Sequence, residues 1–232
     1  MRSLSITVVI VLLLLTWPSR SSSAQDAAKP NLGPAQAAAE SPAKMPEPPA
    51  PVNIPGDLEG VVRKQFGPSF GIATTPSKIL MTHIQQENDS PWTPFMTGDL
   101  DGDDVEDAII IARSKDALGG EAMYDYKVLD PMNQYFGWGD PKVTSTFTAE
   151  DPIHNTLVLV IHGAGKDGWR AEKPKAKFVW INLRFDRLTL SGATLKKKAI
   201  AAVRVEESDG VASLVFWDGK KYKYLPGAAG GG

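Results

Sequence analysis

The part of this sequence best suited to chemistry is a run of nine residues, Asp99 to Asp107, that contains six acidic side chains. Its order, Asp-Leu-Asp-Gly-Asp-Asp-Val-Glu-Asp, places carboxylates at positions 1, 3, 5 and 9 of a tight loop. Carboxylates at this spacing can converge on one hard cation, and the carbonyl oxygen at position 7 can add a further ligand. Calcium accepts six to eight such oxygens in irregular geometry, whereas magnesium requires an octahedron, so we predict one calcium site. The alternative is a solvated Asp/Gly turn that leads into a strand.

An EF-hand does not fit this run, because Ile110 stands at position 12, where a bidentate Glu belongs, and Asp104 stands at position 6, where Gly makes the turn. Residues 95–114 instead resemble the calcium loop of FG-GAP/VCBS-type repeats, which are known from the propellers of integrin alpha subunits and from exported bacterial proteins. The resemblance implies five ligands: Asp99, Asp101, Asp103, the Val105 carbonyl and Asp107. The family usually has Gly at position 6, but aspartate enters the left-handed region at modest cost. Only one copy is present, and a propeller needs at least four blades, so we expect no complete propeller.

A second candidate for chemistry is His162, which ends an apolar run and is followed by Gly-Ala-Gly. Residues 157–165 look like the strand and oxyanion loop of an α/β-hydrolase, and residues 67–71 match the G-x-S-x-G pattern of a nucleophile elbow. In that fold the serine follows the oxyanion loop along the chain, whereas here it precedes it. We therefore interpret His162 as a strand-end residue satisfied by backbone groups and expect no catalytic residues. A hydrolase that uses His162 or a bound metal is the alternative.

Residues 163–168 match G-x-G-x-x-G after a strand, but a dinucleotide site needs a helix to begin there, and Pro174 breaks the segment that follows. We predict a glycine-rich turn between strands. Lys173, Lys175 and Lys177 alternate before a strand. We interpret them as charges that protect a sheet edge, with a patch for anionic glycans or lipid head groups as the alternative.

Several aromatic residues stand in loop-like contexts, where they either close off the core, as we expect, or stack on sugar rings. They are Trp92, Tyr135, Phe136, Trp138 and Trp169.

The elements that must position these residues are mainly strands. A short helix after Asp57 is predicted from apolar residues at helical spacing, with Asp57 as its cap and Gly67-Pro68 as its stop. Unbroken, β-branched apolar runs at 108–112 and 157–161 predict strands buried on both faces. Alternating residues predict a half-buried strand at 123–128, and residues 178–183 another.

The C-terminal end is typical of a meander, with strand-like runs at 199–205, 211–217 and 221–225. Turns at 208–210 and 218–219 separate them, and connections this short require antiparallel pairing. The predicted fold class is α+β: a mainly antiparallel β-sheet with a short N-terminal helix, in a single domain of residues 56–226.

The rest of the chain indicates export. Residues 1–24 have the layout of a secretory signal peptide, with Arg2, an apolar stretch at 6–17 and small residues before Gln25. Residues 25–55 are rich in Pro and Ala and predict a disordered tether, and residues 227–232 a disordered Gly-rich tail.

The expected location is therefore periplasmic or extracellular, with no membrane span after signal cleavage. The chain has no cysteine, which excludes a cysteine nucleophile, and its formal net charge of −2 argues against a nucleic-acid binder. A cell-surface glycan and another exported protein are the partner classes that this organisation allows. We expect a non-enzymatic binding or structural module.

Overall fold

The computed structural model describes residues 54–76, 92–114, 116–137, 156–195, 197–207 and 211–227. All of them belong to the second of the two units into which the chain divides, residues 48–232. The predicted signal peptide, nearly all of the predicted tether, Trp138, the turn at 208–210 and most of the predicted tail lie outside the described residues.

The larger of two sheets has six strands and is mostly antiparallel. Its order is β1 (Phe70–Ile72), β3 (Asp107–Ser114), β5 (Thr156–His162), β6 (Ala176–Trp180) and β4 (Lys127–Leu129). Strand β2 (Phe95–Gly98) pairs with the first half of β3, beside the part that β1 occupies. Only the β4–β6 pair is parallel among the described strands.

The smaller sheet is an antiparallel meander of four strands. Its order is β10 (Tyr222–Leu225), β9 (Ala212–Trp217), β8 (Lys198–Glu206) and β7 (Arg187–Leu195). The three C-terminal strands and their antiparallel pairing confirm the sequence prediction. The sequence does not predict β7, because Ser191-Gly192 interrupts its apolar alternation. It also does not predict the division of the strands into two sheets.

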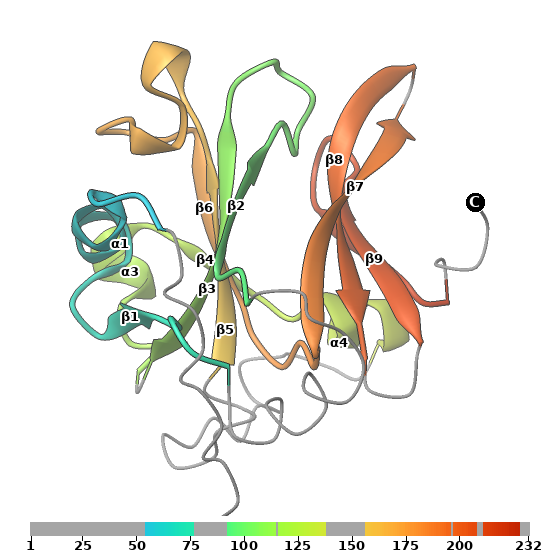
Figure 1. The fold of residues 1–232 in the computed structure, drawn as a ribbon, viewed down its shortest axis with the longest axis horizontal. Helices are drawn as coiled ribbons and strands as arrows, with labels where there is room; N and C mark the ends of the chain where they lie inside the picture. The colour runs from blue at the N-terminus through green and yellow to red at the C-terminus, as the bar shows by residue number, and fades with distance from the viewer. Residues whose placement is uncertain are drawn as a thin grey trace, which may run out of the picture. The chain divides into compact units, whose positions relative to one another are not determined.

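Two hydrophobic layers lie on opposite faces of the larger sheet, with α1 (Leu58–Phe66) and α3 (Glu121–Tyr124) on one side and the smaller sheet, against which α4 (Pro131–Phe136) packs, on the other (Figure 1). Strands β3 and β5 contribute to both layers, because their successive side chains point to opposite faces. Ala108, Ile110 and Leu159 belong to the helix-side layer, whereas Ile109 and Val160 belong to the layer that faces the smaller sheet. This double burial explains why the two strands read as unbroken apolar runs.

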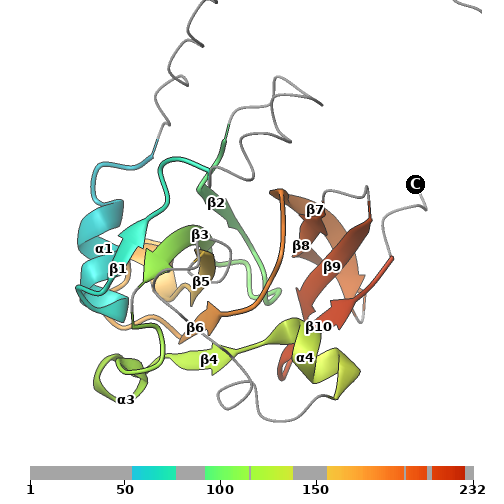
Figure 2. The same ribbon diagram turned by 90° about the horizontal axis from the view of Figure 1, so that it is seen from below.

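The helices are short, and one of them is the 3-10 helix η1 (Gly165–Arg170). Helix α1 confirms the predicted N-terminal helix, and Leu58, Val62 and Phe66 are buried as expected. Its predicted cap is wrong: Asp57 has helical backbone angles and makes no capping hydrogen bond. Figure 2 shows α1 beside β1 of the larger sheet and α4 beside β10 of the smaller one.

The predicted strand at 123–128 is also wrong in part. Tyr124 lies in helix α3, the left-handed Asp125 (φ 51°) ends that helix, and the strand begins only at Lys127. Tyr126, between α3 and β4, is buried, and its hydroxyl donates to the Ala117 carbonyl at 3.0 Å. No helix in the described part of the chain is long and apolar enough to cross a membrane.

Candidate metal centre

The acidic run is the loop of the β2–β3 hairpin, which the pairing of Gly98 with Asp107 closes. Leu100 is buried and anchors the loop in the layer between the two sheets. Gly102 and Asp104 have φ angles of 77° and 65°. Asp104 therefore takes up the left-handed backbone at the position where FG-GAP/VCBS-type loops usually have Gly, as the sequence led us to expect.

The loop is folded around the first of its carboxylates. One oxygen of Asp99 accepts hydrogen bonds from the backbone N–H groups of Gly102 and Asp103 at 2.7 and 3.1 Å. Its other oxygen accepts from the N–H of Asp104 at 3.0 Å. The turn thus satisfies its own backbone donors through one side chain, as Asp does in many turns.

The last carboxylate of the loop, Asp107, is only 1% exposed. Its two oxygens accept from the N–H groups of Leu100 at 2.8 Å and Gly163 at 2.7 Å, so it joins the loop to the segment after β5. Burial raises the pKa of Asp107 to about 7, and the charges of Asp101 and Asp103 act in the same direction, against the two N–H donors.

The segment after β5 can approach the loop only because it carries glycines. A Cβ atom at Gly163 would lie 2.3 Å from the carbonyl oxygen of Glu106, and one at Gly168, which has a φ of 56°, would lie 2.9 Å from it. The G-x-G-x-x-G run is therefore a close-packed turn in which no α-helix begins, as predicted.

Asp101 is the most enclosed of the carboxylates on the open side of the loop, with a side chain that is 3% exposed. Its Oδ2 atom lies 2.6 Å from Lys175 Nζ and 3.3 Å from His162 Nδ1. Its Oδ1 atom is buried and has no hydrogen-bond partner among the described residues. A buried carboxylate oxygen in this state is costly unless a further donor or cation approaches it.

Asp103 lies farther out and shares Lys175 with Asp101, at 3.0 Å from Lys175 Nζ. Burial favours its neutral acid, but the hydrogen bonds from Lys175 and from the Val105 N–H, together with the charge of Lys175, outweigh burial and lower the pKa of Asp103 below the usual value. In turn, the hydrogen bond to Asp101 raises the pKa of the Lys175 amine. The lysine therefore serves as the counter-charge for two carboxylates.

His162 is buried behind Asp101, at the end of β5. Its Nε2 atom lies 2.5 Å from the hydroxyl of Tyr222 in the smaller sheet. Burial lowers the pKa of His162 to about 4 although the charge of Asp101 opposes it, so the ring is neutral near pH 7. The prediction that backbone groups satisfy this ring is wrong, because its two nitrogens face the side chains of Asp101 and Tyr222.

The five ligands implied by the resemblance are only partly assembled. Asp99, Asp101 and Asp107 each bring a carboxylate oxygen to within 4.8 Å of the others. Asp103 is outside this group and faces Lys175, and Val105 uses its backbone N–H to donate to Asp103 at 3.0 Å.

Sequence reasoning missed Lys175 and Tyr222 as members of the site. The antiparallel pairing of β5 with β6 sets His162 opposite Ala176, so residue 175 comes beside the end of β5. This register, and not a local sequence pattern, brings Lys175 to the site. Lys177, which we had grouped with it, instead donates to the carbonyl groups of Gln65 and Tyr124.

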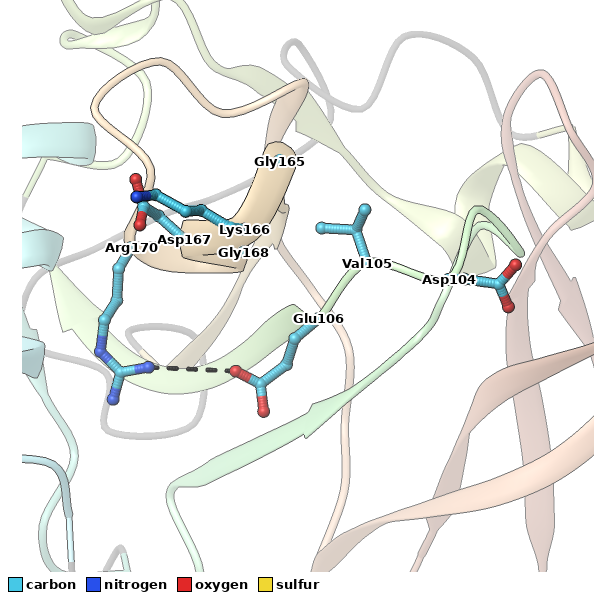
Figure 3. Close-up of a pocket in the computed structure, with 8 residues that line it drawn as sticks. All are labelled: Asp104, Val105, Glu106, Gly165, Lys166, Asp167, Gly168 and Arg170. Atoms are coloured by element: carbon cyan, nitrogen blue, oxygen red, sulfur yellow. Dashed lines mark ion pairs between the residues drawn. The ribbon is translucent and has the colours of Figure 1, made fainter.

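A pocket of about 520 Å³ lies between the end of the acidic loop and η1, lined by residues 104–106, 165–168 and 170. Figure 3 shows Glu106 pointing toward Arg170, whose guanidinium lies 3.9 Å away, while Asp104 points away from both. Arg170 also donates to Asp57 at 2.7 Å, so its charge is already matched.

The aromatic residues singled out from the sequence divide into two groups. Trp169 is buried, and Trp92 is partly buried and donates to the Ala73 carbonyl at 2.6 Å, as expected of residues that close off the core. Tyr135 and Phe136 on α4 are 52% and 44% exposed and contact each other edge to face.

No family model, no curated protein and no solved structure matches the chain. The likeness of residues 95–114 to an FG-GAP/VCBS-type loop therefore stays a prediction from the sequence.

Proposed function

We propose that the β2–β3 loop binds one calcium ion and that the ion stabilises an exported, non-enzymatic binding or structural module. The observation that carries this proposal is the group of Asp99, Asp101 and Asp107, whose oxygens lie within 4.8 Å of one another while Asp101 Oδ1 is buried without a described partner. A cation between these carboxylates would supply the missing partner. It would also relieve the repulsion that helps to keep the pKa of Asp107 high.

The chemistry of the donors favours calcium over other divalent ions. The proposed ligands are all oxygens: the carboxylates of Asp99, Asp101, Asp103 and Asp107, and the Val105 carbonyl. Calcium accepts six to eight such oxygens in irregular geometry, whereas magnesium requires an octahedron and keeps several waters. Asp103, which lies outside the group of three and faces Lys175, would have to move toward the ion.

A structural role is supported by the contacts that the loop makes with both sheets. The Asp99 carbonyl accepts from the N–H of Ala201 in β8 at 2.7 Å, and Asp107 accepts from Gly163 next to β5. Asp101 reaches Tyr222 of β10 through His162. An ion held by these carboxylates would therefore stiffen the junction between the two sheets.

The module in this proposal is a single domain of residues 56–226, and not a complete propeller. A signal peptide would export it to the periplasm or the cell exterior, where millimolar calcium fills even a weak site. Its partner would be a cell-surface glycan or another exported protein.

The described residues do not favour His162 as a catalytic residue in the alternative, a hydrolase that uses His162 or a bound metal. Its ring is 1% exposed and engaged on both sides, which leaves no nitrogen to accept a substrate proton. The serine of the G-x-S-x-G match, Ser69, donates to the Asp116 carbonyl and makes no described contact with His162.

Thermal melting of the purified chain tests the calcium proposal. At calcium ten times above the dissociation constant, binding stabilises the folded state by about 1.4 kcal/mol, which raises Tm by roughly 3–5 °C for a domain of this size. Magnesium should raise it much less. Asp101→Asn should abolish the shift, and Asp104→Asn, which removes a charge from the same loop but no proposed ligand, should retain it. Equal melting temperatures in calcium and in chelator would overturn the proposal.

A further inference from the structure

Lys175 places a positive charge where the proposed ion would need its ligands. Its Nζ atom lies 2.6 Å from Asp101 Oδ2 and 3.0 Å from Asp103 Oδ2. Both carboxylates belong to the ligand set implied by the sequence. Two positive charges cannot share these oxygens at such distances without strong repulsion.

The backbone of Lys175 is held in place, whereas its side chain is half-exposed to water. The Lys175 N–H donates to the His162 carbonyl at 2.9 Å, and β6 begins at the next residue. Its side chain is 50% exposed, whereas that of Asp101 is 3% exposed. The amine can therefore swing into water while the carboxylate and the backbone stay in place.

We infer that Lys175 is an internal competitor for the calcium site: its amine holds Asp101 and Asp103 when no ion is bound and leaves them when calcium enters. This inference rests on the proposed function, and it adds that competition by Lys175 determines how tightly the loop binds calcium. Lys175 partly neutralises the loop without a metal, and Asp99 and Asp107 are held by backbone N–H groups. The protein should accordingly remain folded in chelator and bind calcium by exchange.

Titration calorimetry with calcium chloride on the full chain tests the exchange. Lys175→Met removes the competing charge but keeps the aliphatic length, so calcium should bind about tenfold more tightly than to the wild type. Lys173→Met is the matched control, since Lys173 is an exposed lysine of the same connection with no described ion pair to the loop, and it should bind as the wild type does.

Melting in chelator gives a second readout on the same proteins. Lys175→Met should melt below the wild type without metal, because Asp101 loses its counter-charge in a buried position. Calcium should then raise the Tm of this variant by more than that of the wild type. Lys173→Met should follow the wild type in both conditions.

Chemical labelling of the wild type avoids any folding defect of the variant. Acylation by an N-hydroxysuccinimide ester, read by mass spectrometry, requires a free amine, and the contacts with two carboxylates hold Lys175 back. Calcium should increase the labelling rate of Lys175 severalfold and leave that of Lys173 unchanged.

The possible results separate this inference from the proposed function. If the wild type and Lys175→Met bind calcium equally tightly, or if calcium leaves the labelling of Lys175 unchanged, the competitor role is overturned while calcium binding stands. Binding by Lys175→Met alone would overturn both calcium binding by the wild type and the exchange, because Lys175 would then exclude calcium and not yield to it. If neither protein binds calcium, both are overturned.

Discussion

The acidic loop and the turn between β9 and β10 are built by the same local chemistry and lie in opposite electrostatic surroundings. Each connects two antiparallel strands and begins with an aspartate whose side chain accepts hydrogen bonds from backbone N–H groups of the residues that follow it. Asp218 accepts from Lys220 and Lys221 at 2.8 and 2.9 Å, and Asp99 accepts from three N–H groups of its own loop. The two structures differ in how the surroundings stabilise the negative charge of their carboxylates.

The turn at Asp218 is self-sufficient. The backbone N–H of Lys221 lowers the pKa of Asp218, and the charges of Lys221 and Lys223 lower it further. In the acidic loop, by contrast, burial and like charges raise the pKa of Asp107 to about 7 even though two N–H groups donate to it. An Asp/Gly turn alone needs no cation. The loop needs a counter-charge because it carries several carboxylates into the interior.

Replacing Asp107 in the acidic loop should lower the unfolding free energy far more than replacing Asp218 in the turn. Asp107→Ala leaves the N–H groups of Leu100 and Gly163 without acceptors in a buried site, which should cost about 3 kcal/mol of unfolding free energy. Asp218→Ala should cost much less, because the N–H groups that it releases are exposed and pass to water. Urea denaturation in chelator measures both, and equal losses would show that burial does not distinguish the two regions.

The buried contacts behind the loop, from Asp101 through His162 to Tyr222, should give the next largest loss of stability when they are broken. Tyr222→Phe removes the hydroxyl that contacts His162 Nε2 and leaves a buried ring nitrogen without a partner, at a cost of about 2 kcal/mol. Tyr224→Phe is the control, since its hydroxyl contacts Ser213, away from the loop. Only the first variant should also weaken the calcium response. If Tyr222→Phe lost stability but kept the calcium response, the contact between Tyr222 and His162 would not affect calcium binding by the loop.

The parts of the fold that sequence could predict are those with a local signal. Strands β3 and β5 are buried on both faces and therefore read as unbroken apolar runs. The Asp218-Gly219 turn fixes the β9–β10 hairpin by its own residues. Strand β7 has no such signal, because Ser191-Gly192 interrupts its apolar alternation and its two-residue connection to β8 lacks the Asn-Gly or Asp-Gly pair typical of a hairpin.

In the candidate site, too, the sequence predicted only the residues that have a local signal. The spacing of aspartates in one loop indicated a cation site and its carboxylates, all within nine residues. Lys175 contacts Asp101 across 74 positions, and Tyr222 contacts His162 across 60. These contacts depend on which strands pair and on how the two sheets pack, which no local pattern encodes.

The calcium response itself should separate the two aspartate-led structures. Asp99→Asn weakens a proposed ligand and should remove the calcium stabilisation of about 1.4 kcal/mol expected at ten times the dissociation constant. Asp218→Asn makes the same change in the self-sufficient turn and should leave the full calcium shift in Tm. If both variants lost the shift, or both kept it, the ion would not be bound by the acidic loop.

The smallest effect should come from the backbone of the loop and not from its charge. Asp104 has a φ of 65°, a conformation that costs a residue with a Cβ more than it costs Gly, whereas Gly219 in the other turn has a φ of 95°. Asp104→Gly should therefore raise the unfolding free energy by about 0.5–1 kcal/mol, and Gly219→Ala should lower it by a similar amount. Asp104→Asn removes the same charge as Asp104→Gly but keeps the Cβ, so urea denaturation of the two variants isolates the backbone contribution. Equal stability of the Gly and Asn variants would mean that the left-handed turn at position 6 carries no strain, and that the usual Gly of FG-GAP/VCBS-type loops offers this chain no advantage.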